Sequence, residues 1–523
     1  MRQENYKFGR YITNDNNSRW ADADEIKAAS TIKRINIEAD VCSGGGIPVI
    51  SDGRTVYVDN SDTHTIIFGS TGSKKTRIFG LPLINILAMA GESFIATDPK
   101  SELLNRTSSL VAAKGYKIIV LNFRDLKQSD YWNPIMLPYF LYHSGKTDEA
   151  ISLINDFITS LAEPQKKSTK DIYFIDLACS QILANMLFFI ETASPEEANI
   201  YNFANFFAAK SSPEETEKLS KFTAEGSIAS INFKSILTNI SAKGTFGNVS
   251  SSVSAMLNPF VIRKSLCQVL SQCSFDIRSI GKTKTAIYII VPDEKTTLHF
   301  LVTAFIKQTY EALINEAQQQ GNKKLPVRLN FVLDEFCNIP AIPDMASMIS
   351  AARSRNMRFF LMAQSLWQLN QKYKEDADTI KGNCDNWVFL TSREYDLLKE
   401  ISILCGDTFF RDSDGSIKSH PLISISELQR LKKEYGETLI LHGRNYPFIT
   451  DLPDINEYKF KIYPQFKTED RELPKIVLYD VEKVIKSIIN QQRHLPFSIE
   501  VCGKKTYYSE VVKTPEKNNA LDW

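Results

Sequence analysis

The chain has 523 residues, 43% of them apolar and 11% aromatic, so it can form two or three folded domains and is not a disordered scaffold. Its formal net charge of +1 indicates no class of partner, because a local basic groove can lie within a neutral total. The 8 cysteines form no CxxC pair and lie away from the 6 histidines, which argues against a structural zinc site and predicts reduced thiols.

The N-terminal segment MRQENYKFGR is polar, so we expect no signal peptide. The longest apolar runs, 81–90 and 175–190, are too short or carry polar residues, and we expect buried helices there rather than membrane spans. The sequence as written therefore predicts a cytoplasmic protein without a transmembrane segment.

Residues 65–76, TIIFGSTGSKKT, predict a strand, a glycine-bearing loop and the start of a helix. This is close to the P-loop pattern GxxxxGK[ST], in which backbone N–H groups and a helix N-terminus hold the phosphates of a nucleotide. Lys75 takes the lysine position and Thr76 the position of the Mg²⁺ ligand, but Lys74 replaces the second glycine. The alternative is a polar turn with two glycines. The expected nucleotide-binding residues are Gly69, Ser70, Thr71, Gly72, Ser73, Lys74, Lys75 and Thr76.

The next motif, TDPKSEL at 97–103, follows a predicted strand. Asp98 and Lys100 would lie at the carboxyl end of that strand, where open α/β sheets bind ligands. Asp98 is therefore a candidate nucleotide-binding residue, and a simple helix cap is the equal alternative.

Strand-like apolar runs recur along the chain and alternate with helical patterns, which predicts an α/β fold with a largely parallel sheet buried on both faces. The runs are 63–69, 93–97, 117–123, 285–291, 329–335, 358–364, 386–391 and 438–443. The interval 145–275 shows helical periodicity only, and we interpret it as an all-α domain inserted into the nucleotide-binding sheet. The expected parts are a lead-in (1–60), the first part of the nucleotide-binding domain (61–144), the insertion (145–275), the second part (276–455) and a C-terminal appendage (456–523).

Residues 327–335, VRLNFVLDE, predict a buried strand that ends in two carboxylates, as in a Walker B motif. Asp334 would hold Mg²⁺ together with Thr76, and Glu335 would polarise the attacking water. The alternative is a core strand that ends at a solvated acidic turn. Gln364 follows the next strand and is expected to sense the γ-phosphate, with a satisfied loop amide as the alternative.

The helix expected before that strand ends in the segment AARSRNMR, with arginines at positions 353, 355 and 358. Arg353 and Arg355 are candidate catalytic residues that would reach a neighbouring subunit's ATP and stabilise charge on the transferred phosphoryl group. In a monomer they would instead be a solvated helix end.

Several motifs follow one another along the chain: GSTGSKKT, TDPKSEL, YWNP (131–134), FVLDEF, the arginine-rich helix and AQS. In this order they resemble the type IV secretion coupling proteins of the TraG/VirD group, and the segment NSRWADADEI (17–26) resembles the same family. The resemblance covers about residues 15 to 450. It implies a RecA-like ATPase that uses ATP and Mg²⁺, bears an all-α domain and assembles as a homo-hexamer. Implied partners are a relaxase, the secretion channel and single-stranded DNA, which the ring would pump without sequence preference.

Two features depart from that family, Lys74 and the missing N-terminal membrane anchor. A separately encoded anchor subunit could hold the chain at the cytoplasmic face of the membrane. Two other functions remain open, a double-stranded DNA translocase of the FtsK/HerA kind and an adaptor that binds nucleotide without hydrolysing it. The Lys74 departure fits the adaptor and predicts slow turnover in a motor.

Overall fold

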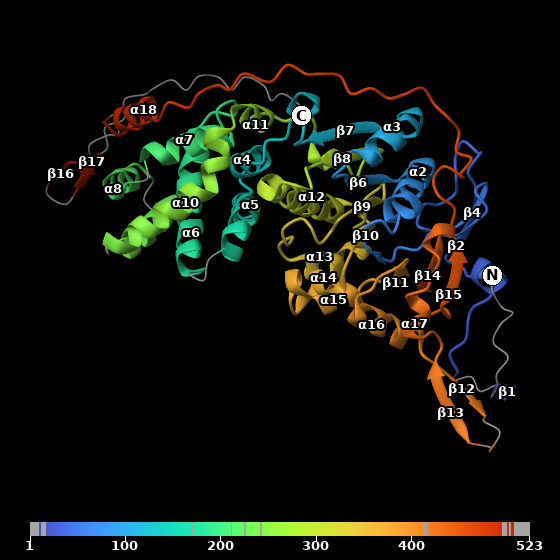
Figure 1. Cartoon of the computed structure of the whole chain (residues 1–523). Helices are drawn as coiled ribbons and strands as arrows, with labels where there is room; N and C mark the ends of the chain where they lie inside the picture. The colour runs from blue at the N-terminus through green and yellow to red at the C-terminus, as the bar shows by residue number, and fades with distance from the viewer. Residues whose placement is uncertain are drawn as a thin grey trace.

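The computed structural model describes residues 10–11, 17–168, 172–210, 212–223, 226–240, 243–411, 414, 416–493, 499–501 and 504–506. At its centre is a nine-stranded sheet in the order β15-β14-β11-β5-β10-β9-β6-β8-β7 (Figure 1). The strands are β5 (Thr65–Phe68), β6 (Ser93–Thr97), β7 (Lys117–Asn122), β8 (Thr285–Ile290), β9 (Leu329–Leu333), β10 (Met357–Ala363), β11 (Asn386–Phe389), β14 (Glu437–His442) and β15 (Phe448–Asp451).

The strands from β11 to β7 are parallel, whereas β14 and β15 extend one edge in antiparallel fashion. All eight runs expected from the sequence lie in this sheet, and the predicted α/β class is confirmed. Every residue of β5, β6, β8, β9 and β10 is buried, because helices cover both faces. This explains why these strands are almost uninterrupted apolar runs.

Alternate residues of β5 point to two different cores. Ile67 packs with the helices on one face, and Ile66 and Phe68 with those on the other. The first face is covered by α2 (Leu81–Ala90) and α3 (Glu102–Ala113). The second carries α12 (His299–Gln319), α13 (Met345–Ala352), α14 (Leu366–Tyr373), α15 (Asp376–Gly382) and α16 (Tyr395–Cys405).

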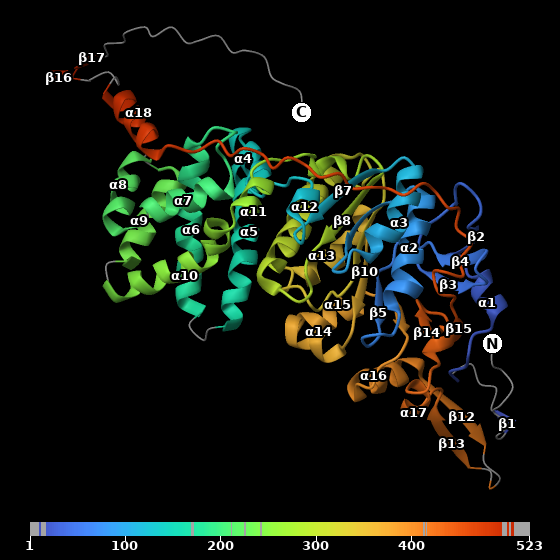
Figure 2. The same cartoon turned by 45° about the horizontal axis from the view of Figure 1, so that its top comes forward.

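A helical unit lies beside the sheet (Figure 2). It consists of α4 (Met136–His143), α5 (Thr147–Ser168), α6 (Ile172–Thr192), α7 (Ile200–Lys210), α8 (Pro213–Phe222), α9 (Ile228–Ile240), α10 (Lys243–Ile262) and α11 (Lys264–Val269). Among the described residues, α6 is the one helix long and apolar enough to cross a membrane, with 56% of its apolar window buried. It packs against α5, α9 and α10.

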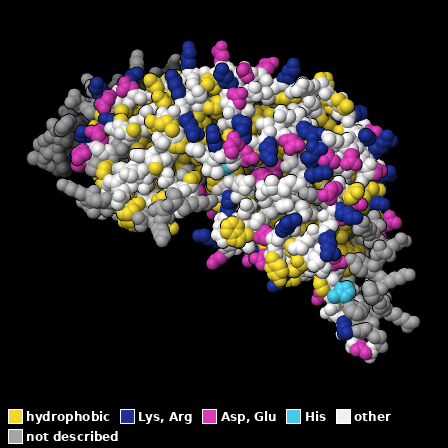
Figure 3. Space-filling model, in the orientation of Figure 1, with side chains coloured by type: hydrophobic (Ala, Val, Ile, Leu, Met, Phe, Trp, Pro, Cys, Tyr) yellow, Lys and Arg dark blue, Asp and Glu magenta, His cyan; other side chains and the backbone are white. Residues whose placement is uncertain are grey.

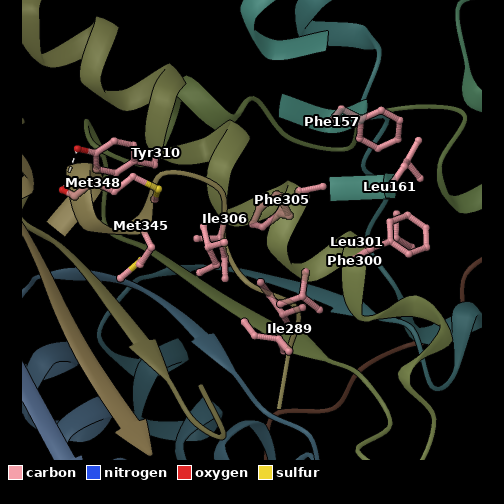
Figure 4. Close-up of a cluster of buried hydrophobic side chains, with 14 of the residues drawn as sticks. Phe157, Leu161, Ile289, Phe300, Leu301, Phe305, Ile306, Tyr310, Met345 and Met348 are labelled. Atoms are coloured by element: carbon pink, nitrogen blue, oxygen red, sulfur yellow. Dashed lines mark hydrogen bonds between the residues drawn. The ribbon is translucent and has the colours of Figure 1, made fainter. Parts of the chain in front are cut away.

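Helix α12 joins the helical unit to the sheet. Its side chains Phe300, Phe305 and Ile306 lie between α5 and strand β8, in the cluster drawn in Figure 4. Trp132, from the YWNP segment, packs edge-on against Phe305 with ring centroids 5.1 Å apart. Its indole Nε1 donates to Gln308 Oε1 at 2.9 Å.

Asn133 holds together the two ends of the helical unit. Its Nδ2 donates to the carbonyl oxygen of Ala198 at 2.8 Å and to that of Ser271 at 3.2 Å. Ser271 lies just after α11, where the chain leaves the unit, and Asn133 lies just before α4, where it enters. The YWNP segment therefore connects the start and the end of the helical unit where the unit meets the sheet domain.

Smaller elements flank the sheet. The N-terminal region forms α1 (Ala23–Ala28) and an antiparallel sheet of β2 (Ile32–Asn36), β4 (Thr55–Asp59) and β3 (Pro48–Ser51). A second antiparallel sheet pairs β1 (Arg10–Tyr11), β12 (Asp407–Arg411) and β13 (Ile417–Pro421) and projects below the main body in Figure 1. The remaining elements are α17 (Ile425–Leu428), α18 (Val481–Arg493), β16 (Ile499–Val501) and β17 (Lys504–Thr506).

The C-terminal segment 452–480 runs without helix or strand from β15 across the sheet domain to the helical unit (Figures 1 and 2). Phe466 N donates to Ser109 Oγ on α3 at 3.1 Å, and Arg471 N donates to the Lys127 carbonyl oxygen at 2.8 Å. Further along, Tyr479 packs its ring against Phe189 and Phe206 of the helical unit. We call this segment the strap.

Arg358 has a structural role, which corrects its inclusion in the arginine cluster expected at a helix end. The chain begins β10 at Met357, so Arg358 lies within the sheet and is 1% exposed. Its guanidinium donates to Glu92 Oε2 at 2.6 Å, to Asn330 Oδ1 at 2.9 Å and to the Ser61 carbonyl at 2.8 Å. A side chain committed in this way cannot reach another subunit.

Removal of the Arg358 side chain should destabilise the protein strongly, because it leaves the Glu92 carboxylate, 12% exposed, short of its main partner. We expect Arg358→Ala to lower the free energy of unfolding by about 3 kcal/mol, the low end for a broken buried pair, since Arg328 stays 3.4 Å from Glu92. Urea denaturation followed by circular dichroism measures this.

The matched control is Arg353→Ala. Its side chain is 52% exposed and pairs with Asp62, so its loss should cost at most about 1 kcal/mol. Equal losses for the two variants would contradict the structural role of Arg358.

Candidate nucleotide-binding site

The glycine-bearing loop lies at the carboxyl edge of the sheet, between β5 and a π-helical turn, η1 (Thr76–Gly80), that leads into α2. Gly69 is required by close packing, because a Cβ there would lie 2.5 Å from Ser73 Oγ. That hydroxyl is buried and makes no hydrogen bond within the protein. A buried, unpaired donor in this loop fits a loop that closes around an anion.

Lys75 lies inside the loop and is 5% exposed. Its ammonium donates to the Gly69 carbonyl oxygen at 2.5 Å. Burial lowers the pKa of Lys75, while the negative charges of Glu335 and Asp334 act in the opposite direction. The loop thus holds a cation beside its own backbone, where phosphates of a nucleotide would lie.

Thr76 meets the end of β9 across the site. Its Oγ1 donates to Asp334 Oδ2 at 2.9 Å, although the two residues are 258 positions apart in the chain. Burial raises the pKa of Asp334 to about 6, and the neighbouring charge of Glu335 acts in the same direction. A hydroxyl and a desolvated carboxylate side by side are oxygen ligands of the kind that Mg²⁺ prefers, so these residues fit the expected metal site.

Gln364 bridges the loop and the second carboxylate. Its Oε1 accepts from Thr71 Oγ1 at 3.0 Å, and its Nε2 donates to Glu335 Oε2. The same Glu335 oxygen accepts from Asn338 Nδ2 at 3.0 Å. The bridge is possible because β10, which ends just before Gln364, lies between β5 and β9 in the sheet.

Glu335 has a backbone φ of +53°, a left-handed conformation that non-glycine residues adopt at a cost of order 1–3 kcal/mol. Its amide N–H donates to Asp334 Oδ1 at 3.0 Å. Backbone strain of this kind clusters at functional sites, where the surrounding structure fixes it. The turn directs the two adjacent carboxylates to different partners.

Lys74 adopts a φ of +65° and its side chain is exposed. The loop therefore keeps the left-handed backbone that a glycine would take at this position, and the lysine accepts the strain.

Asp98 acts as a helix cap. Its carboxylate, 2% exposed, accepts from the backbone N–H of Leu104 on α3 at 2.8 Å. Burial raises the pKa of Asp98 to about 6, and the charge of Asp334 adds to this effect. The geometry supports the cap alternative, and the carboxylate lies close enough to Asp334 for the two negative charges to interact.

Arg353 and Arg355 lie at the opposite edge of the sheet from the loop, just before β10 begins. Arg353 pairs with Asp62 at 2.8 Å and Asp385 at 3.3 Å, and these aspartates precede β5 and β11. Neither arginine can reach the nucleotide-binding loop of its own chain, so any catalytic role requires a neighbouring subunit.

Two contacts at the site were not anticipated from the sequence. Asn338 donates to Glu335, and Arg77 forms a two-pronged ion pair with Asp454, with N···O distances of 2.6 and 2.7 Å. Arg77 follows Thr76 directly, but its partner is 377 positions away, and single-sequence patterns carry no signal for such a pair.

Comparison with known proteins agrees with this geometry. The family model for type IV secretory system conjugative DNA transfer matches residues 19–433. No curated protein matches the sequence.

Solved structures of similar fold include the bacterial conjugative coupling protein TrwB in a trigonal form with sulphate, at 14% identity and a TM-score of 0.57, covering 90% of this chain and 99% of that one. TrwB bound to a non-hydrolysable GTP analogue matches at 13% identity and a TM-score of 0.59, covering 90% and 99%. TrwB with ADP and Mg²⁺ matches at 14% and 0.57, covering 89% and 98%. The family match spans most of the sequence, and the chain therefore belongs to the conjugative DNA transfer family of type IV secretory systems.

Proposed function

We propose that this chain is an ATP-hydrolysing motor that recruits a relaxase–DNA substrate and pumps single-stranded DNA to a conjugative secretion channel. The observation that carries the proposal is the contact between Thr76 and Asp334, which brings a nucleotide-binding loop and an acidic strand end to one point. TrwB, which shares the fold, has been solved with a GTP analogue and with ADP and Mg²⁺.

Each residue of the site has a task in ATP hydrolysis. The Lys75 ammonium moves from the Gly69 carbonyl to the β- and γ-phosphates, which offer a full negative charge in place of a dipole. Glu335 accepts a proton from the attacking water or orients it, and Gln364 links this carboxylate to Thr71 on the loop. Loss or gain of the γ-phosphate would therefore change the contacts of Gln364 with both Thr71 and Glu335.

Thr76 and Asp334 would hold Mg²⁺. When bound, the ion neutralises charge on the β- and γ-phosphate oxygens. Burial and the adjacent charge of Glu335 both raise the pKa of Asp334, and a bound cation would favour its charged form.

The working form is proposed to be a homo-hexamer, as the family resemblance implies. In such a ring Arg353 and Arg355 would serve the loop of a neighbouring subunit, because they lie at the opposite edge of the sheet from their own loop. DNA would pass through the ring and be held by phosphate contacts that weaken with salt. Basic and acidic side chains are interspersed on the face shown in Figure 3, so we do not place the DNA there. Channel components, or a separate anchor subunit, would hold the ring at the cytoplasmic face of the membrane.

The decisive experiment compares ATP hydrolysis without DNA, with single-stranded DNA and with double-stranded DNA, alongside the mass of the oligomer. Stimulation by single strands supports the proposal, and stimulation by double strands alone would favour a translocase of the FtsK/HerA kind. The strained Lys74 backbone favours one other candidate, a nucleotide-binding adaptor, and ATP binding without hydrolysis under all three conditions would support it.

The two Walker B carboxylates should have separable effects. We expect Asp334→Ala to weaken both nucleotide binding and hydrolysis, since it removes a metal ligand. Glu335→Gln should keep binding and lower turnover by about 10²- to 10³-fold, equivalent to roughly 2.7–4 kcal/mol. Calorimetric binding together with phosphate release measures both, and parental turnover in Glu335→Gln would contradict its assignment.

An arginine that acts on a neighbouring subunit makes activity depend on assembly. We expect turnover per chain to rise with protein concentration or on addition of DNA. Mixing Arg355→Ala chains with Glu335→Gln chains should restore part of the activity, because some interfaces then combine an intact arginine with an intact Glu335. No recovery in rings shown to be mixed would exclude the role of Arg355 in trans.

Substitutions of Lys74 test the effect of backbone strain on catalysis. Lys74→Gly and Lys74→Ala remove the same charge, but glycine alone adopts a φ of +65° without strain. We therefore expect Lys74→Gly to hydrolyse ATP faster than both the parent and Lys74→Ala, with a modest change in affinity, whereas Lys75→Ala abolishes binding. If Lys74→Ala proves more damaging than Lys75→Ala, Lys74 is the phosphate-binding lysine.

A further inference from the structure

A pocket of about 320 Å³ opens beside the nucleotide-binding loop. Lys74 and Ile78 form the side that belongs to the loop and the helix after it, and Tyr435, Gly436, Asp451 and Asp454 lie on the other side. This volume is at the lower end of the range of small-molecule sites.

Close backbone packing builds the far wall of the pocket. Gly436 has a φ of +72°, and a Cβ there would lie 2.0 Å from the Leu452 carbonyl oxygen. Leu452 N donates to the Gly436 carbonyl oxygen at 3.1 Å, which joins the segment of Tyr435 to the segment of Asp451 and Asp454. The Arg77–Asp454 pair then ties this wall to the turn that follows Thr76.

The charges around the pocket favour one part of a nucleotide over the other. Five acidic residues line it and would repel a triphosphate, namely Asp52, Glu434, Asp451, Asp454 and Glu457. The hydroxyl and amino groups of a nucleoside can instead donate to such carboxylates. Asp454 is occupied by Arg77, while the side chain of Asp451 is exposed. The basic residues Lys74 and Lys75 mark the boundary at which the phosphates would begin.

Tyr435 offers an aromatic surface in this pocket. It ends a short 3₁₀ turn (Lys433–Tyr435) and is 72% exposed. The ammonium of Lys432 lies over the ring, 5.9 Å from its centroid, which leaves the other face of the ring to a ligand. Stacking on an aromatic side chain is tolerant of base identity, because every base presents a π face.

We propose that this pocket receives the base and ribose of the bound nucleotide, with Tyr435 against the base and Asp451 as a hydrogen-bond acceptor. The assignment rests on the proposed function, since it takes the triphosphate to lie on the loop at Lys75 and Thr76. Lys74 belongs both to the loop and to the pocket, and it is placed to contact the ligand where phosphate and nucleoside meet.

The test compares two ligands on the full chain by calorimetry in the presence of Mg²⁺, namely ATP and inorganic tripolyphosphate. Only ATP carries a nucleoside, so the parent should bind ATP more tightly. We expect Tyr435→Ala to weaken ATP binding about tenfold, as expected for loss of a stacked base, and to leave tripolyphosphate binding unchanged. Tyr435→Phe, which keeps the ring, should retain the parental affinity.

Tyr173→Ala is the matched control, because Tyr173 is 63% exposed and lies on α6, away from the site. The assignment is overturned if the parent binds both ligands equally well, or if Tyr435→Ala affects both alike or neither. Those results would not contradict phosphate binding by the loop. Failure of the parent to bind either ligand would instead refute the proposed function, and this assignment with it.

Discussion

Strand β10 lies between β5 and β9, and this position constrains the residues at both of its ends. Parallel strands end at a common edge, so the residue after β10 must lie between the loop after β5 and the carboxylates after β9. Gln364 occupies that point and contacts both. At its other end β10 buries Arg358, whose pairing with Glu92 fixes the start of the strand. An apolar strand anchored by polar groups at both ends can thus hold the proposed catalytic groups from three segments in register.

The sequence was sufficient for the features that depend on burial and local order. Strands covered on both faces read as continuous Ile, Val, Leu and Phe, so their existence and the two phosphate-related motifs were predictable. Strand order was not, because crossovers leave no periodic trace, and β15 was missed because it is short and partly exposed at the sheet edge. Arg358 was misinterpreted for a similar reason, since its neighbours Arg353 and Arg355 made a helix end the simplest interpretation.

Three of the seven described non-glycine residues with a left-handed backbone lie at the carboxyl edge of the sheet. Lys74, Ser101 and Glu335 have φ values of +65°, +58° and +53°, and each follows a different strand. Tight turns at this edge bring side chains toward the space where the phosphates of a ligand would lie, at the expense of backbone strain. Propensity alone gives no indication of such turns, because they are imposed by the surrounding packing.

The strap affects how the helical unit can move. Asn133 joins the entry and exit of that unit, and α12 packs between its helix α5 and the sheet. The strap adds a second attachment, through Arg471 beside β7 and Tyr479 in the aromatic cluster around Phe189. Any rotation of the helical unit away from the sheet domain would therefore break two separate sets of contacts, the packing of α12 on α5 and the contacts of the strap.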